Sequence, residues 1–76
     1  MTNKQQNTLD IAYFGDNLKR VRIMRKLSRE EFADRIGVSS RIIYDYEEGF
    51  KTPKLETAIK IAIVLEVTLD SILRLA

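Results

Sequence analysis

The chain of 76 residues contains no cysteine and no histidine. It therefore has no disulfide, and it lacks the residues that make an ordinary zinc site. A domain of fewer than about 80 residues usually needs such a staple or very economical packing. The length leaves room for one core only, and with 45% apolar residues we expect that core to hold the fold alone or with help from dimerisation.

Long apolar runs and catalytic motifs are also missing. No run reaches the roughly 20 residues of a membrane span, and the first residues, MTNKQQNT, are polar rather than signal-like, so we expect a cytoplasmic protein without a membrane partner. The glycines form no phosphate-binding loop, and the acids of Glu30–Glu31 and Glu47–Glu48 are neighbours that point in different directions on a helix. The sequence predicts no enzyme, and no metal, cofactor or small-molecule ligand.

Charge is unevenly distributed although the net charge is only +2. Six basic and no acidic residues lie between Lys19 and Arg29, whereas acidic residues gather at 45–48. A basic face of this kind suits phosphate. A solvated helix face is the commoner cause of a run of charge, and this is our interpretation of Lys19, Arg20, Arg25 and Lys26.

Two short helices around a glycine turn are predicted at residues 28–49. Ser28 and Glu31 form a capping box that starts a helix at Arg29, and Gly37 ends it after about two turns. Ser39 is placed to cap the next helix, and Gly49 to end it. The spacing of the second helix predicts an inward face made of Ile42, Ile43 and Tyr46.

Helical spacing extends on both sides of this segment. Apolar residues from Ile11 onward predict a helix that ends near Lys26, whereas residues 1–8 lack such periodicity and are predicted to form a flexible arm before a domain at 9–76. Thr68 is placed to cap a last helix. The chain is therefore predicted to be all-α with five helices. The predicted apolar face of the fourth is Leu55, Ala58, Ile59, Ala62 and Leu65.

The sequence resembles the lambda-repressor-like (Cro-type, XRE) helix-turn-helix family from about Phe14 to Leu73. The matching segments include Leu18-Lys19-Arg20-Val21-Arg22, Leu27-Ser28-Arg29-Glu30-Glu31-Phe32-Ala33, Ile36-Gly37-Val38-Ser39, Tyr46-Glu47-Glu48-Gly49 and Leu65-Glu66-Val67-Thr68-Leu69-Asp70. The resemblance implies a compact five-helix domain that binds double-stranded DNA, with the second helix of the motif in the major groove. It also implies a largely buried, structural ion pair between Arg22 and Glu47.

Site residues follow from the same resemblance. It places them at the start of the first motif helix, on the exposed side of the recognition helix and in the loop after it: Arg29, Ser39, Ser40, Arg41, Tyr44, Asp45, Lys51, Thr52 and Lys54. Arg41 is the strongest candidate for reading a base, because a guanidinium can donate to O6 and N7 of guanine. Asn17 and Thr52 are weaker candidates for neutral phosphate contacts.

Several residues depart from the family pattern. Arg29 stands where Gln is usual, which favours phosphate or guanine over adenine. Asp45 would be repelled by phosphate, but its carboxylate could accept from the N4 amino group of cytosine or orient Arg41. Lys26 and Glu66 stand where Gly or Asn often ends a helix, so an unfavourable backbone or a different stop is expected.

Unusual apolar residues point to self-association. Ile23, Met24 and Ile63 replace residues that are usually polar and exposed, and further apolar residues follow near the C-terminus: Leu69, Ile72 and Leu75. We expect a homodimer formed through the fourth and fifth helices. It is expected to bind a pseudo-palindromic operator as a sequence-specific transcriptional regulator, with repression as the expected outcome. The alternative is a helix-turn-helix domain used for protein contacts, as in an antitoxin or anti-repressor partner, with the acidic residues at 45–48 facing a basic surface.

Overall fold

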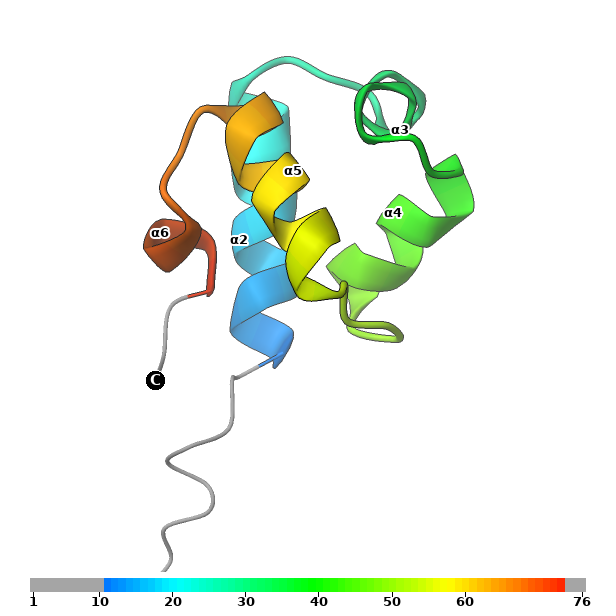
Figure 1. Ribbon diagram of the computed structural model, residues 1–76. Coiled ribbons are helices and arrows are strands. Elements are labelled where there is room, and N and C mark those ends of the chain that lie inside the picture. Colours follow the sequence, from blue (N-terminus) through cyan, green and yellow to red (C-terminus); the bar gives the residue numbers. More distant parts are fainter. Residues whose placement is uncertain (1–10, 74–76) are drawn as a thin grey trace, which may run out of the picture.

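The computed structural model describes residues 11–73 and contains five helices and no strand within that range (Figure 1). This confirms the predicted all-α class. The helices are α2 (Ile11–Met24), α3 (Arg29–Ile36), α4 (Ser40–Glu48), α5 (Leu55–Leu65) and α6 (Leu69–Leu73). The arm predicted at residues 1–8 lies outside the described residues.

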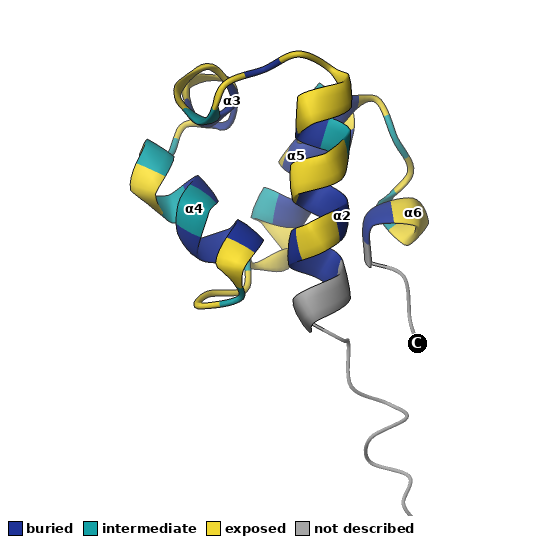
Figure 2. Cartoon of the chain, turned by 180° about the vertical axis from the view of Figure 1, so that it is seen from behind, coloured by how far each residue is buried: buried dark blue, intermediate teal, exposed yellow. Residues whose placement is uncertain are grey.

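The helices enclose one core. α2 packs against α4 and α6, α3 packs against α4 and α5, and α5 also contacts α6. Figure 2 shows that the buried positions of each helix face the others, as amphipathic helices require. The largest fully buried side chains come from α2, α3, α4, α5 and α6: Leu18, Phe32, Ile43, Ile61, Leu65 and Ile72.

Local capping fixes the ends of α3. The Ser28 hydroxyl accepts from the Glu31 N–H at 3.0 Å, and the Glu31 carboxylate accepts from the Ser28 N–H at 2.8 Å, so the predicted capping box is confirmed. That backbone hydrogen bond is also the main reason why the pKa of Glu31 lies below its usual value. Gly37 ends α3 with φ 78°, in the left-handed region that glycine adopts without steric cost.

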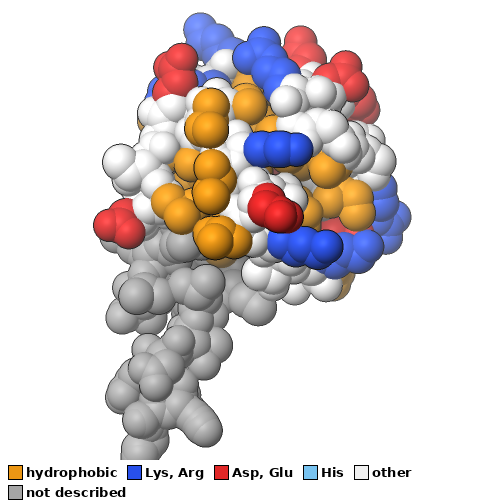
Figure 3. All heavy atoms as spheres, in the orientation of Figure 1, with side chains coloured by type: hydrophobic (Ala, Val, Ile, Leu, Met, Phe, Trp, Pro, Cys, Tyr) orange, Lys and Arg blue, Asp and Glu red, His pale blue; other side chains and the backbone are white. Residues whose placement is uncertain are grey.

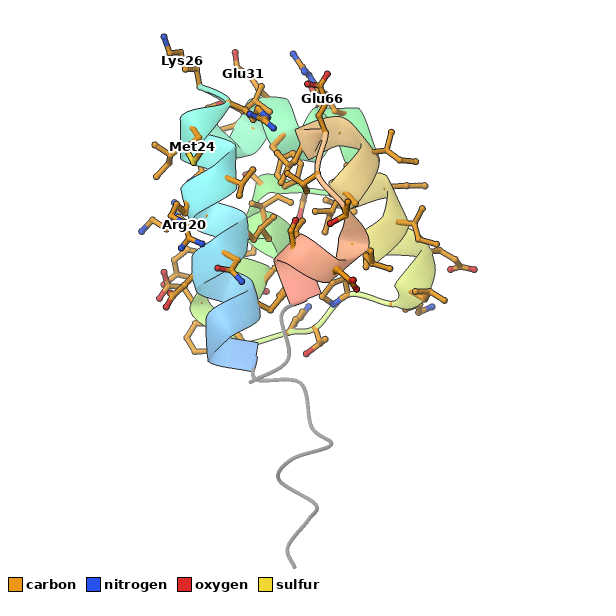
Figure 4. All side chains as sticks on the ribbon, turned by 90° about the vertical axis from the view of Figure 1, so that its left-hand side faces the viewer. Arg20, Met24, Lys26, Glu31 and Glu66 are labelled. Atoms are coloured by element: carbon orange, nitrogen blue, oxygen red, sulfur yellow. The ribbon has the colours of Figure 1, made fainter. Side chains whose placement is uncertain are left out.

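Two other helices end on residues with a side chain. Lys26, which follows α2, has φ 60°, and Glu66, which follows α5, has φ 61°, so the unfavourable backbone expected at both positions is present. Figure 4 shows both residues at the same end of the molecule. There the Arg25 guanidinium donates to the Leu65 carbonyl at 2.7 Å. Arg25 therefore caps α5, a role that its interpretation as an ordinary surface charge had missed.

The apolar face of α5 was only partly predicted. Ala58, Ala62 and Leu65 are buried as expected, but Leu55 and Ile59 are exposed, and Ile61 is buried in their place. The prediction was wrong because eight of the eleven residues of this helix are apolar, so its sequence does not define one stripe. Packing against α3 and α6 decides which side is covered.

Exposed apolar residues also differ from the predicted patch. Ile23, Met24 and Ile63 are exposed as expected, but Ile72 is 1% exposed and belongs to the core, and Leu75 lies outside the described residues. In Figure 4 Met24 lies on α2, at the edge of the view opposite to α5. The predicted single patch is therefore divided between α2 and α5.

Gly15 allows α2 and α4 to approach closely. A Cβ atom added at Gly15 would lie 2.8 Å from the carbonyl oxygen of Tyr46, and closer still to that of Glu47. Atoms of the α4 backbone cannot swing away as the end of a flexible side chain can. The sequence analysis gave Gly15 no role, because a glycine inside a helix does not by itself reveal a neighbouring backbone.

We expect Gly15→Ala to reduce the free energy of unfolding by about 1 to 3 kcal/mol, the usual cost of overpacking a well-packed contact. The measurement is urea denaturation followed by circular dichroism. Asp16→Ala, at the exposed next position of the same helix, is the matched control and should change the stability by no more than about 0.5 kcal/mol. Equal stability of the Gly15 variant and the native chain would contradict the close approach.

Candidate nucleic-acid interface

A positively charged hollow opens between the first turns of α3 and α4. Its volume is about 520 Å³, and the residues that line it are Arg22, Ser28, Arg29, Glu30, Ser40, Arg41 and Tyr44. Four of these are predicted site residues: Arg29, Ser40, Arg41 and Tyr44. The helices are held here by their caps, since the Ser39 hydroxyl accepts from the Ile42 N–H at 3.3 Å at the start of α4. The two helix N-termini add partial positive charge to that of the guanidinium groups.

Tyr44 organises the two arginines of this hollow that are predicted to contact DNA. The guanidinium carbon of Arg29 and that of Arg41 each lie 5.3 Å from the centre of the Tyr44 ring, which is within the range of cation–π attraction. Tyr44 was predicted only as an exposed position of the recognition helix. Its stacking role depends on a residue of α3, so only the tertiary structure shows it.

A buried carboxylate anchors Arg29. Glu47, whose side chain is fully buried, accepts from Arg22 Nε at 2.6 Å, from Arg22 Nη2 at 3.3 Å and from Arg29 Nε at 3.0 Å. Arg22 Nη1 also donates to the Leu27 carbonyl at 2.7 Å. The Arg22–Glu47 pair implied by the family resemblance is therefore present, and Arg29 joins it as a third member. The cluster connects α2, α3 and α4.

A second carboxylate holds Arg41. Asp45 accepts from Arg41 Nε at 3.1 Å, one turn away on α4, and lies 3.8 Å from the Lys51 ammonium group in the following loop. Asp45 was predicted to be exposed, but it is 6% exposed, so that prediction was wrong. The two basic side chains and the loop after α4 cover it, which spacing along the helix does not reveal.

The remaining predicted residues lie around the hollow rather than in it. Ser39 is exposed at the start of α4, whereas Thr52 and Lys54 are exposed in the loop that precedes α5. Phe50 begins this loop and is also exposed, and its ring centre lies 6.1 Å from that of Tyr44. The loop therefore starts directly beside Tyr44 of α4.

Two further predictions concern the inward face of α4 and the role of Asn17. Ile43 and Tyr46 are buried as predicted, and Ile42 is partly buried and packs against the core. Asn17 is also buried, donates to the Ile72 carbonyl at 3.3 Å and accepts from Arg20 at 2.6 Å. It joins α2 to α6, so its suggested contact with phosphate is replaced by a structural role.

The acidic surface expected at residues 45–48 is largely absent. Asp45 and Glu47 are buried and paired with basic side chains, which leaves Glu48 as the exposed acid of this segment. The protein-contact alternative depended on an exposed acidic end of the helix. The basic side of the motif, by contrast, is open to solvent.

Comparison with known proteins agrees with this geometry. Residues 18–72 match the family model HTH_3, described as helix-turn-helix. The chain belongs to this helix-turn-helix family. Because its relatives are transcriptional regulators, membership also confirms the expectation that the chain is not an enzyme.

Two curated relatives of this helix-turn-helix protein are transcriptional regulators by name. It is 36% identical over 61 residues to the uncharacterized HTH-type transcriptional regulator YqaE of Bacillus subtilis, a match that covers 80% of this chain and 53% of the relative. It is 41% identical over 49 residues to the cryptic phage CTXphi transcriptional repressor RstR of Vibrio cholerae, covering 64% of this chain and 44% of RstR. The chain thus spans about half the length of these relatives.

Solved structures show the same fold. The restriction-modification controller protein C.AhdI from Aeromonas hydrophila superposes with a TM-score of 0.79 at 25% identity, over 86% of this chain and 98% of that protein. A helix-turn-helix transcriptional regulator from Vibrio cholerae gives a TM-score of 0.74 at 31% identity, over 82% of this chain and 35% of the other. The compact five-helix fold is therefore that of known regulators.

We expect Glu47→Gln to destabilise this helix-turn-helix protein by about 3 to 5 kcal/mol, because Arg22 would remain buried without a full counter-charge. Chemical denaturation measures this loss. Glu48→Gln removes the same charge from the exposed neighbouring residue and should cost no more than about 0.5 kcal/mol. If the two variants were equally stable, the Glu47 cluster would not be the link between the three helices.

Proposed function

We propose that the chain is a sequence-specific DNA-binding regulator of transcription, acting as a repressor, that binds a pseudo-palindromic operator as a homodimer. The observation that carries the proposal is the hollow between α3 and α4, where two arginines project from a helix-turn-helix toward solvent. In this motif the second helix enters the major groove while the first lies across the backbone. α4 is therefore the proposed recognition helix.

The chemistry of the exposed groups suits the two parts of such an interface. Arg41, with a side chain 75% exposed, has the fork of donors that matches the O6 and N7 acceptors of guanine. Lys51, Thr52 and Lys54 lie in the exposed loop, where contacts to phosphate would fix the orientation of the protein without reading sequence. Arg29, with one donor held by Glu47, still has Nη groups to offer phosphate or guanine.

A stripe of exposed apolar residues on α5 supports the homodimer. Leu55, Ile59 and Ile63 follow one another at intervals of four residues and are all exposed, so they lie on one side of the helix. Figure 3 shows hydrophobic side chains gathered in a band over α5. A second copy of the chain would cover this band and place the two recognition helices about one turn of DNA, roughly 34 Å, apart.

The name of RstR supports repression as the outcome of binding. None of the helices between residues 11 and 73 has the length and apolar composition of a membrane span. The cytoplasmic location expected from the sequence stays a prediction. In vitro selection of bound duplexes followed by footprinting tests operator, symmetry and half-site spacing together.

We expect Arg41→Ala to weaken binding to the selected operator by about 1 to 3 kcal/mol and to remove the preference for guanine at one position of each half-site. Quantitative gel-shift titration at fixed salt measures both effects, and circular dichroism checks that the fold is intact. Lys19→Ala, at an exposed residue of α2 outside the hollow, is the control for loss of one charge. Unchanged affinity and base preference in the folded Arg41 variant would remove Arg41 as the reader.

We expect Ile63→Glu to convert the dimer into a monomer, because a charge would be buried without a partner in the apolar contact. Sedimentation equilibrium measures the mass. The same substitution at Ile23, which is exposed on α2, should leave the dimer intact. Dissociation by the Ile23 variant but not by the Ile63 variant would move the interface to α2.

A further inference from the structure

Asp45 is a buried acid in the segment proposed to face DNA. Its exposed fraction is 6%, and it lies on α4 between Tyr44 and the core residue Tyr46. A carboxylate beside a phosphate backbone weakens binding by repulsion. The proposed function assigns it no contact with DNA, so its presence on the recognition helix needs an explanation.

The contacts of the Asp45 carboxylate lead outward rather than into the core. Its partners are Arg41, whose side chain is 75% exposed, and Lys51, whose side chain is 56% exposed. The loop after α4 is closed by the Asp45 carbonyl instead, which accepts from the Phe50 N–H at 2.8 Å and from the Lys51 N–H at 3.2 Å. Loss of the carboxylate would therefore leave no buried charge unpaired and would not open the loop.

The same contacts restrict Arg41. Asp45 occupies the Nε donor at 3.1 Å, and the Tyr44 ring lies 5.3 Å from the guanidinium carbon. With Nε engaged, the pair of donors that remains for a base is Nη1 and Nη2, at the tip of the side chain. Those two donors are spaced to meet O6 and N7 of one guanine, and a side chain held in place loses less rotamer freedom on binding.

We propose that Asp45 is a positioning residue that orients Arg41 for guanine and, by partly neutralising Arg41 and Lys51, lowers affinity for DNA of any other sequence. The inference rests on the proposed function. It assigns the carboxylate a role in specificity rather than in affinity. Specificity depends on the difference between the affinity for the operator and the affinity for other DNA. Weaker binding to other DNA raises specificity as effectively as tighter binding to the operator.

The test compares Asp45→Ala with the native chain on three duplexes: the selected operator, the same operator with the contacted guanine changed to adenine, and an unrelated sequence. We expect the preference for guanine over adenine, about 5- to 150-fold for an arginine–guanine pair, to fall toward unity. We expect binding to the unrelated duplex to become tighter. The plot of log affinity against log salt should steepen by up to about 0.9, because one more cation is released to meet a phosphate.

Asp34→Ala is the matched control, since it removes the same charge from an exposed residue of α3 that does not line the hollow. It should leave the guanine preference unchanged. Arg41→Lys, at an exposed side chain, removes the guanidinium but keeps the charge, and should abolish the preference even if Asp45→Ala fails to fold. Adding Asp45→Ala to Arg41→Lys should then have no further effect on base preference.

Three results would overturn the inference. One is a folded Asp45→Ala variant that keeps the native guanine preference. Another is a further loss of base preference when Asp45→Ala is added to Arg41→Lys, because the carboxylate would then contact a base itself. The third is an absence of binding by the native chain to every duplex at low salt, which refutes the proposed function as well and is thus distinguishable from the first two.

Discussion

The buried carboxylate of Glu47 joins the three helices that surround the hollow. It accepts hydrogen bonds from Arg22 on α2 and Arg29 on α3, and it lies on α4 itself. An isolated charge at this depth would be strongly unfavourable, so any arrangement of the three helices that separated Glu47 from its arginines would be destabilised. Because Arg29 also reaches the hollow, the cluster that fixes the fold fixes part of the proposed DNA-binding surface too.

Asp45 and Arg41 repeat this arrangement near solvent. In each cluster one carboxylate serves two basic groups, so each keeps a net positive charge although both contain an acid. The ring of Tyr44 lies against one arginine from each cluster. The positive potential of this surface thus comes from arginines that are held in place, whereas Lys51 and Lys54 supply exposed charge in a loop. A surface built in this way combines fixed donors for bases with adaptable charges for phosphates.

Close packing complements the ionic contacts. Gly15 leaves room for the backbone of α4. Asn17, two residues further along α2, donates to the carbonyl of Ile72 on α6. Such contacts join residues far apart in the sequence, and neither is marked by spacing or composition. On α5, by contrast, apolar residues lie on both sides of the helix. Those on one side fill the core, and those on the other form the exposed stripe. In the proposed homodimer this exposed stripe would be covered by a second copy of the chain.

Features that depend on near neighbours follow from the residues alone: the helices, the Ser28–Glu31 capping box and the Gly37 stop. At Lys26 and Glu66 comparison with the family pattern left two outcomes open, an unfavourable backbone or a different stop, and the positive φ values show the first. The family resemblance supplied the Arg22–Glu47 pair. Three features became visible in the folded chain alone: Asp45 is buried, Ile61 rather than Ile59 faces the core, and Tyr44 stacks on two arginines. The physical reason is that burial and stacking depend on which helices meet, whereas caps and turns are formed by residues a few positions apart.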